Sequence, residues 1–202
     1  MKKIIIYSSL FVMSFSAFAN TNEQYPIQVE AYVEMYNVSK AEAEKAMLLE
    51  ANQEQIIDAI TDEFKGRIAG IYKEHNPYKM VVRVKENGKK MTENRLFSID
   101  GINEKMPIEI IYGAKEAAQI AKGQVNKAYN LVNCFFTEVQ DSGYDEKTGE
   151  IIVRVTGEET PANMELVQTI QRKWNNPKIP LKVEFVNFTL NPLNYNYVLL
   201  TH

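Results

Sequence analysis

Few residues in this 202-residue sequence could carry out acid–base or nucleophilic chemistry. His75 is the only histidine inside the chain, because the second, His202, is the last residue. A hydrolytic triad needs a nucleophile, a base within hydrogen-bond reach and an orienting acid. The sequence contains neither a Gly-x-Ser-x-Gly elbow nor a Gly-Asp-Ser-Gly run. We therefore expect no catalytic residues, and we expect His75 to stabilise the turn before Pro77.

Carboxylates are more abundant, but their spacing fits no metal or phosphate site. Glu74 and His75 are adjacent, and consecutive residues of a strand point to opposite faces of its sheet. Asp141, Asp145 and Glu146 do not have the spacing of an EF-hand loop. The sequence also contains no glycine-rich phosphate loop. We therefore expect no bound metal and no cofactor.

Charge and cysteine content exclude further classes of protein. The formal net charge is −3, whereas non-specific nucleic-acid binding needs a basic surface, so we expect no nucleic-acid partner. A single cysteine, Cys134, excludes an internal disulfide and a cysteine-rich zinc site. Its neighbours in residues 131–136 are mostly apolar, which predicts a buried and inert thiol.

The first residues have the pattern of an export signal. Lys2 and Lys3 precede a mostly apolar run over residues 4–15, and Ala17-Phe18-Ala19 supplies the small residues that a signal peptidase accepts. The run is too short for a membrane span, which needs about 20 apolar residues. We expect cleavage after Ala19, which leaves 21 basic and 26 acidic residues, a formal net charge of −5. The predicted location is periplasmic or secreted, in a bacterium, with no membrane span in the mature chain.

The elements of the first half are predicted to be helices followed by strands. Ser39 and Glu42 have the spacing of a capping box, in which each side chain binds the backbone amide of the other. Apolar residues then recur at helical spacing, so we expect one long helix, or two in tandem, over residues 40–66, and a short helix over 32–36. The expected strands are 68–72, 78–84 and 107–112. A turn-like stretch over residues 73–77 is expected between the first two, followed by a turn at Asn87-Gly88 within a charged loop over 85–90.

The second half repeats this order of elements without a repeat of sequence. Thr160-Pro161 predicts the start of a helix, because threonine caps helices and proline suits the first helical position. Apolar and charged residues alternate over 181–186, which predicts a strand with one buried face. The other expected elements are a helix over 114–132 and a hairpin with strands 135–140 and 150–155 joined by residues 145–149.

This order of elements predicts an α+β protein with two small subdomains. Each is expected to contain an antiparallel sheet of about three strands packed against helices. The predicted organisation is a signal peptide over residues 1–19, an N-terminal subdomain over 20–113 and a C-terminal subdomain over 114–202.

The end of the chain is unusually apolar. Such a tail must dock on its own core, pair with a sheet edge or bind another molecule. If it binds a partner, the residues expected to make contact are Phe185, Phe188, Leu190, Tyr195, Tyr197 and Leu199.

Three segments together resemble the pro-regions of secreted serine proteases of the streptogrisin and α-lytic type. They are residues 36–44, a short turn, a serine and an Ala/Glu-rich helix; residues 64–75 continuing through Val81-Val82; and residues 141–145 followed by 149–155. The resemblance covers roughly residues 32–186. It implies two α+β subdomains that chaperone and inhibit a protease, with contacts made by the second sheet and the C-terminal tail. The corresponding regions here are residues 181–186 and 187–202.

The sequence departs from that family because no protease domain follows, so we expect a stand-alone chain that acts in trans. Our leading hypothesis is an exported, non-enzymatic protein-binding module, a protease inhibitor or chaperone whose partner is a secreted or periplasmic protease. One alternative is a structural or stress-related envelope protein. The other is a hydrolase with an unrecognised site around His75.

Overall fold

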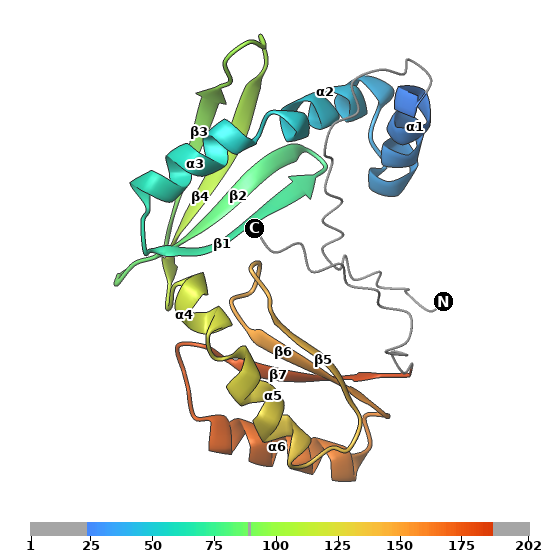
Figure 1. Ribbon diagram of the computed structural model, residues 1–202, viewed down its shortest axis with the longest axis vertical. Helices are drawn as coiled ribbons and strands as arrows, with labels where there is room; N and C mark the ends of the chain where they lie inside the picture. The colour runs from blue at the N-terminus through green and yellow to red at the C-terminus, as the bar shows by residue number, and fades with distance from the viewer. Residues whose placement is uncertain (1–23, 89, 188–202) are drawn as a thin grey trace, which may run out of the picture.

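The computed structural model describes residues 24–88 and 90–187 and confirms an α+β fold. Two lobes lie one above the other along the long axis of the molecule (Figure 1). We call residues 24–114 the first lobe and residues 118–187 the second lobe, because each has its own sheet and its own cluster of buried side chains. No helix in the described ranges is long and apolar enough to cross a membrane.

The first lobe begins with three helices. Ser39 caps the second through the predicted capping box, with its amide donating to the Glu42 carboxylate at 2.8 Å and its hydroxyl accepting from the Glu42 amide. The predicted helix over 40–66 is two helices in tandem. The first helix is longer than the predicted 32–36, since Pro26 lies in its first turn, where a proline is tolerated. The bounds are α1 Gln24–Tyr36, α2 Lys40–Ala51 and α3 Glu54–Glu63.

The first sheet has four strands in the order β1-β2-β4-β3. Strands β2 and β4 run parallel, which corrects the expectation of an antiparallel sheet. The chain passes from β2 to the outer strand β3 and returns by a turn into the middle of the sheet, so β4 runs in the direction of β2. Strand β3 was not predicted, because its charged edge sequence has little apolar alternation. The bounds are β1 Ile68–His75, β2 Tyr78–Lys85, β3 Met91–Ser98 and β4 Lys105–Ala114.

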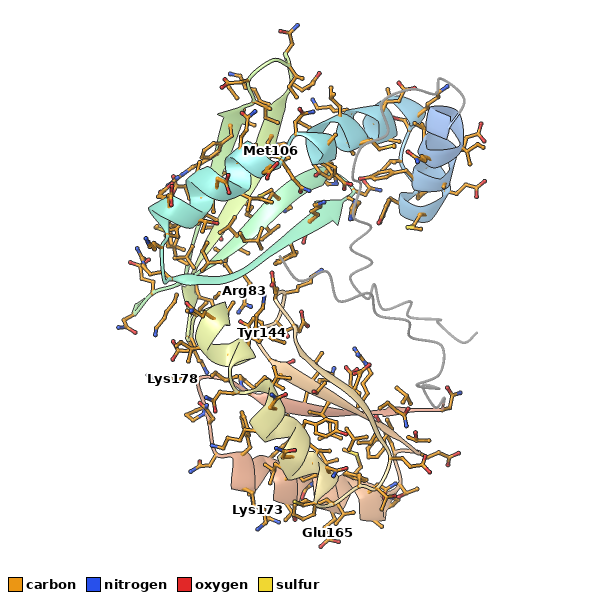
Figure 2. All side chains as sticks on the ribbon, in the orientation of Figure 1. Arg83, Met106, Tyr144, Glu165, Lys173 and Lys178 are labelled. Carbon is orange, nitrogen blue, oxygen red and sulfur yellow. The ribbon has the colours of Figure 1, made fainter. Side chains whose placement is uncertain are left out.

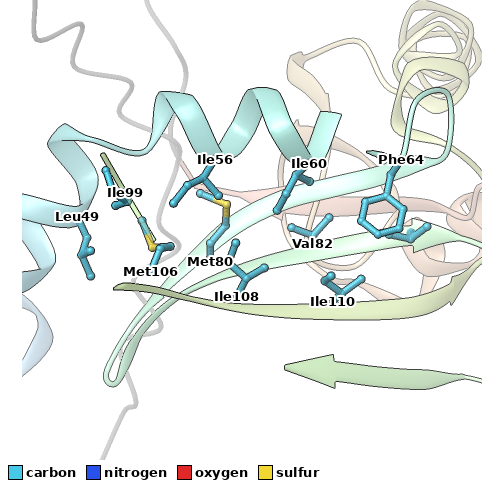
Figure 3. Packing of buried hydrophobic residues seen from close by; sticks show 11 residues of the cluster. Leu49, Ile56, Ile60, Phe64, Met80, Val82, Ile99, Met106, Ile108 and Ile110 are labelled. Atoms are coloured by element: carbon cyan, nitrogen blue, oxygen red, sulfur yellow. The ribbon is translucent and has the colours of Figure 1, made fainter. Parts of the chain in front are cut away.

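The core of the first lobe lies between the tandem helices and one face of this sheet (Figure 3). Ile60 of α3 and Ile110 of β4 are fully buried. Burying one such side chain contributes about 1.5–3 kcal/mol. The buried cluster consists of Leu49, Ile56, Ile60, Phe64, Met80, Val82, Val84, Ile99, Met106, Ile108 and Ile110.

The second lobe has a three-stranded sheet in the order β5-β6-β7. The hairpin of β5 and β6 is antiparallel as expected, although its first strand is Val139–Tyr144 and not 135–140. Strands β6 and β7 are parallel, again correcting the expected antiparallel sheet. The cause is α6, which crosses over between the two strands and so returns the chain to the same end of the sheet. The predicted helix over 114–132 is divided near Gly123. The bounds are α4 Ala118–Lys122, α5 Val125–Asn133, β5 Val139–Tyr144, β6 Ile151–Thr156, α6 Pro161–Trp174 and β7 Leu181–Val186.

Alternation along β6 builds the second core, as the sequence predicts. Ile151, Val153 and Val155 are fully buried beneath α5 and α6. The Trp174 indole lies in this core and donates to the Ile179 carbonyl at 2.7 Å. Cys134 is exposed, which corrects the predicted buried thiol. It follows the last residue of α5 on the solvent side of the helix.

The lobes meet at the turn between β5 and β6, which we call the hairpin tip (residues 144–149). The Glu146 carboxylate accepts from the Ile71 amide at 2.9 Å, and the Tyr144 hydroxyl donates to the Ala69 carbonyl at 2.7 Å. Arg83 of β2 donates to the Glu146 carbonyl at 2.9 Å. Only a glycine fits at position 70, because a Cβ there would lie 2.2 Å from the Glu146 carbonyl oxygen. The hairpin tip therefore docks on β1 through the side chains of Tyr144 and Glu146 and through a close approach of the Glu146 backbone to Gly70.

Candidate functional site

The strand singled out by the sequence, β7, is an outer strand of the second sheet. Its only strand neighbour is β6, among the residues that the structure describes. Ile151 donates to the Pro180 carbonyl and Gly157 to the Val186 carbonyl, so the even-numbered residues of β7 direct their backbone groups toward β6. Consequently the amide and carbonyl of Val183 and Phe185 point away from the sheet.

These outward groups form a short row along the edge of the sheet. Alternate residues of a strand are about 7 Å apart, since each residue advances the strand by about 3.3 Å. The row begins at the Leu181 carbonyl, which accepts from the Gln171 side chain at 3.4 Å. Beyond that contact, the edge has the arrangement that an added strand from another protein would use.

Charged side chains cover the helix-free face of the same sheet. Arg154 of β6 binds Asp141 of β5 at 3.0 Å and Glu184 of β7 at 3.1 Å. Lys182 approaches Glu184 at 2.9 Å. The network ties the three strands together across the sheet. A partner seated on the β7 edge would therefore meet alternating charges on this face.

Phe185, the one predicted contact residue that the structure describes, packs toward its own core. Its ring meets that of Phe136 edge to face, with centroids 5.6 Å apart. The side chain thus holds β7 in place, while the backbone of the same residue faces outward. The other predicted contact residues, Phe188, Leu190, Tyr195, Tyr197 and Leu199, lie outside the described residues.

The surroundings of His75 bear on the hydrolase alternative. The half-buried ring stacks on Tyr36 with centroids 3.8 Å apart, and its Nδ1 lies 2.7 Å from the Tyr32 hydroxyl. A carboxylate oxygen of Glu50 is 3.7 Å from the same nitrogen. A catalytic relay needs one partner on each ring nitrogen. Here the Tyr32 hydroxyl and the Glu50 carboxylate both approach Nδ1, and with the stacking on Tyr36 they hold the ring in place.

Burial shifts the pKa values of His75 and Glu50 in opposite directions. It lowers the pKa of His75, with a further contribution from the Lys73 ammonium. Burial also raises the pKa of Glu50, against the opposing effect of Lys73. The neutral imidazole is therefore the favoured form in the folded chain. We call Tyr32, Tyr36 and His75 the aromatic clamp, because they fasten α1 to the β1–β2 hairpin. The neighbouring Lys73–Glu50 ion pair joins β1 to α2.

The sequence did not predict the contacts of the aromatic clamp or those of the hairpin tip. Tyr32 and His75 are 43 positions apart, and Ile71 and Glu146 are 75 positions apart. One local signal was available for the hairpin tip, since Gly70 lies within an apolar strand, where glycine often marks a close approach of another backbone.

The sequence was compared with protein-family models and with curated proteins. No protein-family model matches the sequence, and no curated protein matches it at a significant level.

Proposed function

We propose that this chain is an exported, non-enzymatic protein-binding module that takes the backbone of a partner protein onto the free edge of β7. The observation that carries the proposal is the outward row of amides and carbonyls at Val183 and Phe185. Strand addition of this kind gains affinity from main-chain hydrogen bonds and selectivity from the flanking side chains. The Arg154–Glu184 network is the neighbouring source of selectivity.

The partner we propose is a secreted serine protease of the streptogrisin or α-lytic type, inhibited or chaperoned in trans. The support is the resemblance to pro-regions of such proteases over residues 32–186. In those pro-regions the second sheet and the tail contact the protease, and the corresponding strand here is β7, whose outer edge pairs with no other strand of the described residues. Export is part of the same proposal, and N-terminal sequencing of protein from the periplasm or medium would test cleavage after Ala19.

The test is inhibition of a purified protease of that type by the full chain and by Val183→Pro. Proline at this position removes an outward amide and no bond to β6, so the strand is expected to persist. Inhibition should weaken about tenfold, since an amide is lost and the proline ring obstructs the edge. Val183→Ala is the matched control, because it shortens the side chain and keeps the amide.

The outcomes separate the hypotheses. Equal inhibition by Val183→Pro and the unsubstituted chain would exclude the β7 edge as the contact. Deleting residues 188–202 measures the contribution of the predicted tail contacts independently of the edge. The envelope-protein alternative predicts no inhibition by any form, together with an envelope defect when the protein is absent from the cell.

A further inference from the structure

A cavity of about 200 Å³ lies where the two lobes meet, beside the hairpin tip. The first lobe contributes Arg83 of β2 and Lys90, and the segment that joins the lobes contributes Lys115. The second lobe contributes Tyr144, Gly149 and Lys178. Figure 2 shows Arg83, Tyr144 and Lys178 at the level between the lobes. The cavity is therefore completed only when the hairpin tip is docked.

Positive charge dominates the lining. Four cationic side chains face two carboxylates, Glu116 and Glu150. Glu116 is already paired with Lys85. That pair, with smaller contributions from the Ala117 amide and the Lys178 ammonium, holds the pKa of the Glu116 carboxyl below its usual range. Within residues 24–88 and 90–187, none of the four cations forms an ion pair of its own. They are Arg83, Lys90, Lys115 and Lys178.

Two of these cations are held in place by backbone contacts. The Arg83 guanidinium donates to the Glu146 carbonyl at 2.9 Å and lies against Gly149, where a Cβ would come within 2.7 Å of Nη2. The Lys115 ammonium donates to the Pro177 carbonyl at 3.3 Å. Carbonyl partners fix these groups without neutralising them. The net charge of the chain is −3, so this surplus of positive charge is local.

We infer that this cavity binds a small phosphate-class oxyanion. Like charges held around one space repel one another, and a doubly charged tetrahedral anion would relieve that repulsion. Arginine and lysine side chains bind such oxygens through short, charge-assisted hydrogen bonds. The volume is below the roughly 300–1,000 Å³ of pockets for drug-sized ligands, which favours a small ion with a few waters. Because both lobes supply the cations, the bound anion fastens the lobes together.

The test is equilibrium dialysis of the full chain against labelled inorganic phosphate at low ionic strength, with acetate in a second arm. Saturable binding of phosphate at one site per chain is expected, and acetate should compete weakly because it is a planar monoanion. Lys178→Gln should weaken phosphate binding about tenfold, the loss expected for one charge-assisted hydrogen bond. Lys178 is exposed, so this variant is expected to fold.

Lys105→Gln is the matched control, with the same change of charge on an exposed lysine. It lies at the other end of β4, about 26 Å along the strand from Gly113. Unchanged binding in Lys105→Gln together with the loss in Lys178→Gln supports the site. Absence of saturable phosphate binding, equal losses in both variants, or acetate binding as tightly as phosphate would each overturn the inference. None of these results depends on protease inhibition.

Discussion

In the first lobe, side chains of the second lobe cover the outer edge of β1, through the Tyr144 bond to Ala69 and the Glu146 bond to Ile71. In the second lobe, the described part of the chain places one side chain, that of Gln171, on the outward backbone of β7. Exposed strand edges invite pairing with other chains, so proteins usually blunt them. Among the described residues, the β1 edge is covered by docking of the second lobe, whereas no strand pairs with the β7 edge.

The remaining edge of the first lobe, β3, is protected by charge. Arg95 binds Glu63 of α3 at 2.8 Å and Glu93 of its own strand at 2.6 Å. The pairs lie along the strand that would otherwise present an open edge, although Met91 and Leu96 are exposed there. The two edges of the first lobe thus differ: the second lobe docks on β1, and β3 carries the ion pairs of Arg95. This difference between lobes is why we place partner binding on the second.

Substitutions that create a cavity of the same kind in each core should cause the largest losses of stability. Ile60→Ala in the first lobe and Ile170→Ala in the second each remove a fully buried side chain and should cost about 2–5 kcal/mol. Trp174 is the only tryptophan, so its fluorescence reports the second core alone. In urea titrations, Ile170→Ala should lower the midpoint of the fluorescence transition, and Ile60→Ala should leave it in place while shifting the circular dichroism transition. Equal shifts of the fluorescence midpoint would mean that the lobes unfold as one unit.

Gly70→Ala should break the contact that distinguishes the β1 edge from the β7 edge. The added methyl group meets the Glu146 carbonyl oxygen at 2.2 Å, and backbone on both sides prevents an easy escape. We expect a loss of about 1–3 kcal/mol in thermal unfolding and a larger radius of gyration in X-ray scattering, as the hairpin tip leaves β1. Gly143→Ala is the control, since a Cβ there meets nothing within 4 Å. An unchanged radius of gyration in Gly70→Ala would show that the lobes stay together without this contact.

Much of the fold follows from local signals in the sequence. Ser39 and Thr160 cap helices as predicted, because capping depends on residues within one turn. The alternation over β6 predicted which of its side chains are buried, whereas in β7 only Leu181 is buried. The pairing of strands was predicted less well. The parallel pairing of β2 with β4 depends on β3 lying at the outer edge of the sheet, which no local pattern indicates. Charged residues in β3 concealed the strand itself.

The candidate site was predicted as a region rather than as a set of contacts. The sequence singled out strand 181–186, and the structure shows which backbone groups of that strand face outward. The alternation along β7 already explains why Phe185 is apolar, because Phe185 lies on the same face of the strand as Leu181 and Val183. The contacts around His75 and Glu146 join residues distant in the chain, and no local pattern encodes them.

His75→Gln should loosen the aromatic clamp at a smaller cost, about 1 kcal/mol at neutral pH, through the lost stacking on Tyr36 and altered bond to Tyr32. The folded chain resists protonation of His75, whose pKa lies below the usual 6.5. Stability should therefore fall as pH decreases through 6.5, when the unfolded chain takes up the proton first. Glu50 contributes the opposite trend, because its raised pKa favours the folded state in acid.

Comparing the unsubstituted chain with His75→Gln at pH 7.5 and 5.5 isolates the histidine, since Glu50 is present in both. The unsubstituted chain should lose more stability than the variant over this interval in urea titrations. Amide hydrogen exchange should show faster opening of α1 in the variant. If stability depends on pH in the same way in both proteins, the His75 imidazole does not contribute to the pH dependence. If amide hydrogen exchange in α1 is unchanged in the variant, His75 does not hold α1 on the β1–β2 hairpin.

Replacing the arginine that bridges two carboxylates in each lobe should cause the smallest losses of stability. The pair of variants also distinguishes which lobe contacts the partner. Arg95→Gln and Arg154→Gln each break two partly exposed ion pairs and should cost at most about 1 kcal/mol, less at high salt. The two variants are thus nearly matched in stability, measured by urea titration. If a partner uses the open side of the second sheet, Arg154→Gln alone should weaken protease inhibition, because Arg154 binds Glu184 of the edge strand. If Arg95→Gln also weakens inhibition, the β3 edge takes part in the contact, and its ion pairs do not keep partners away.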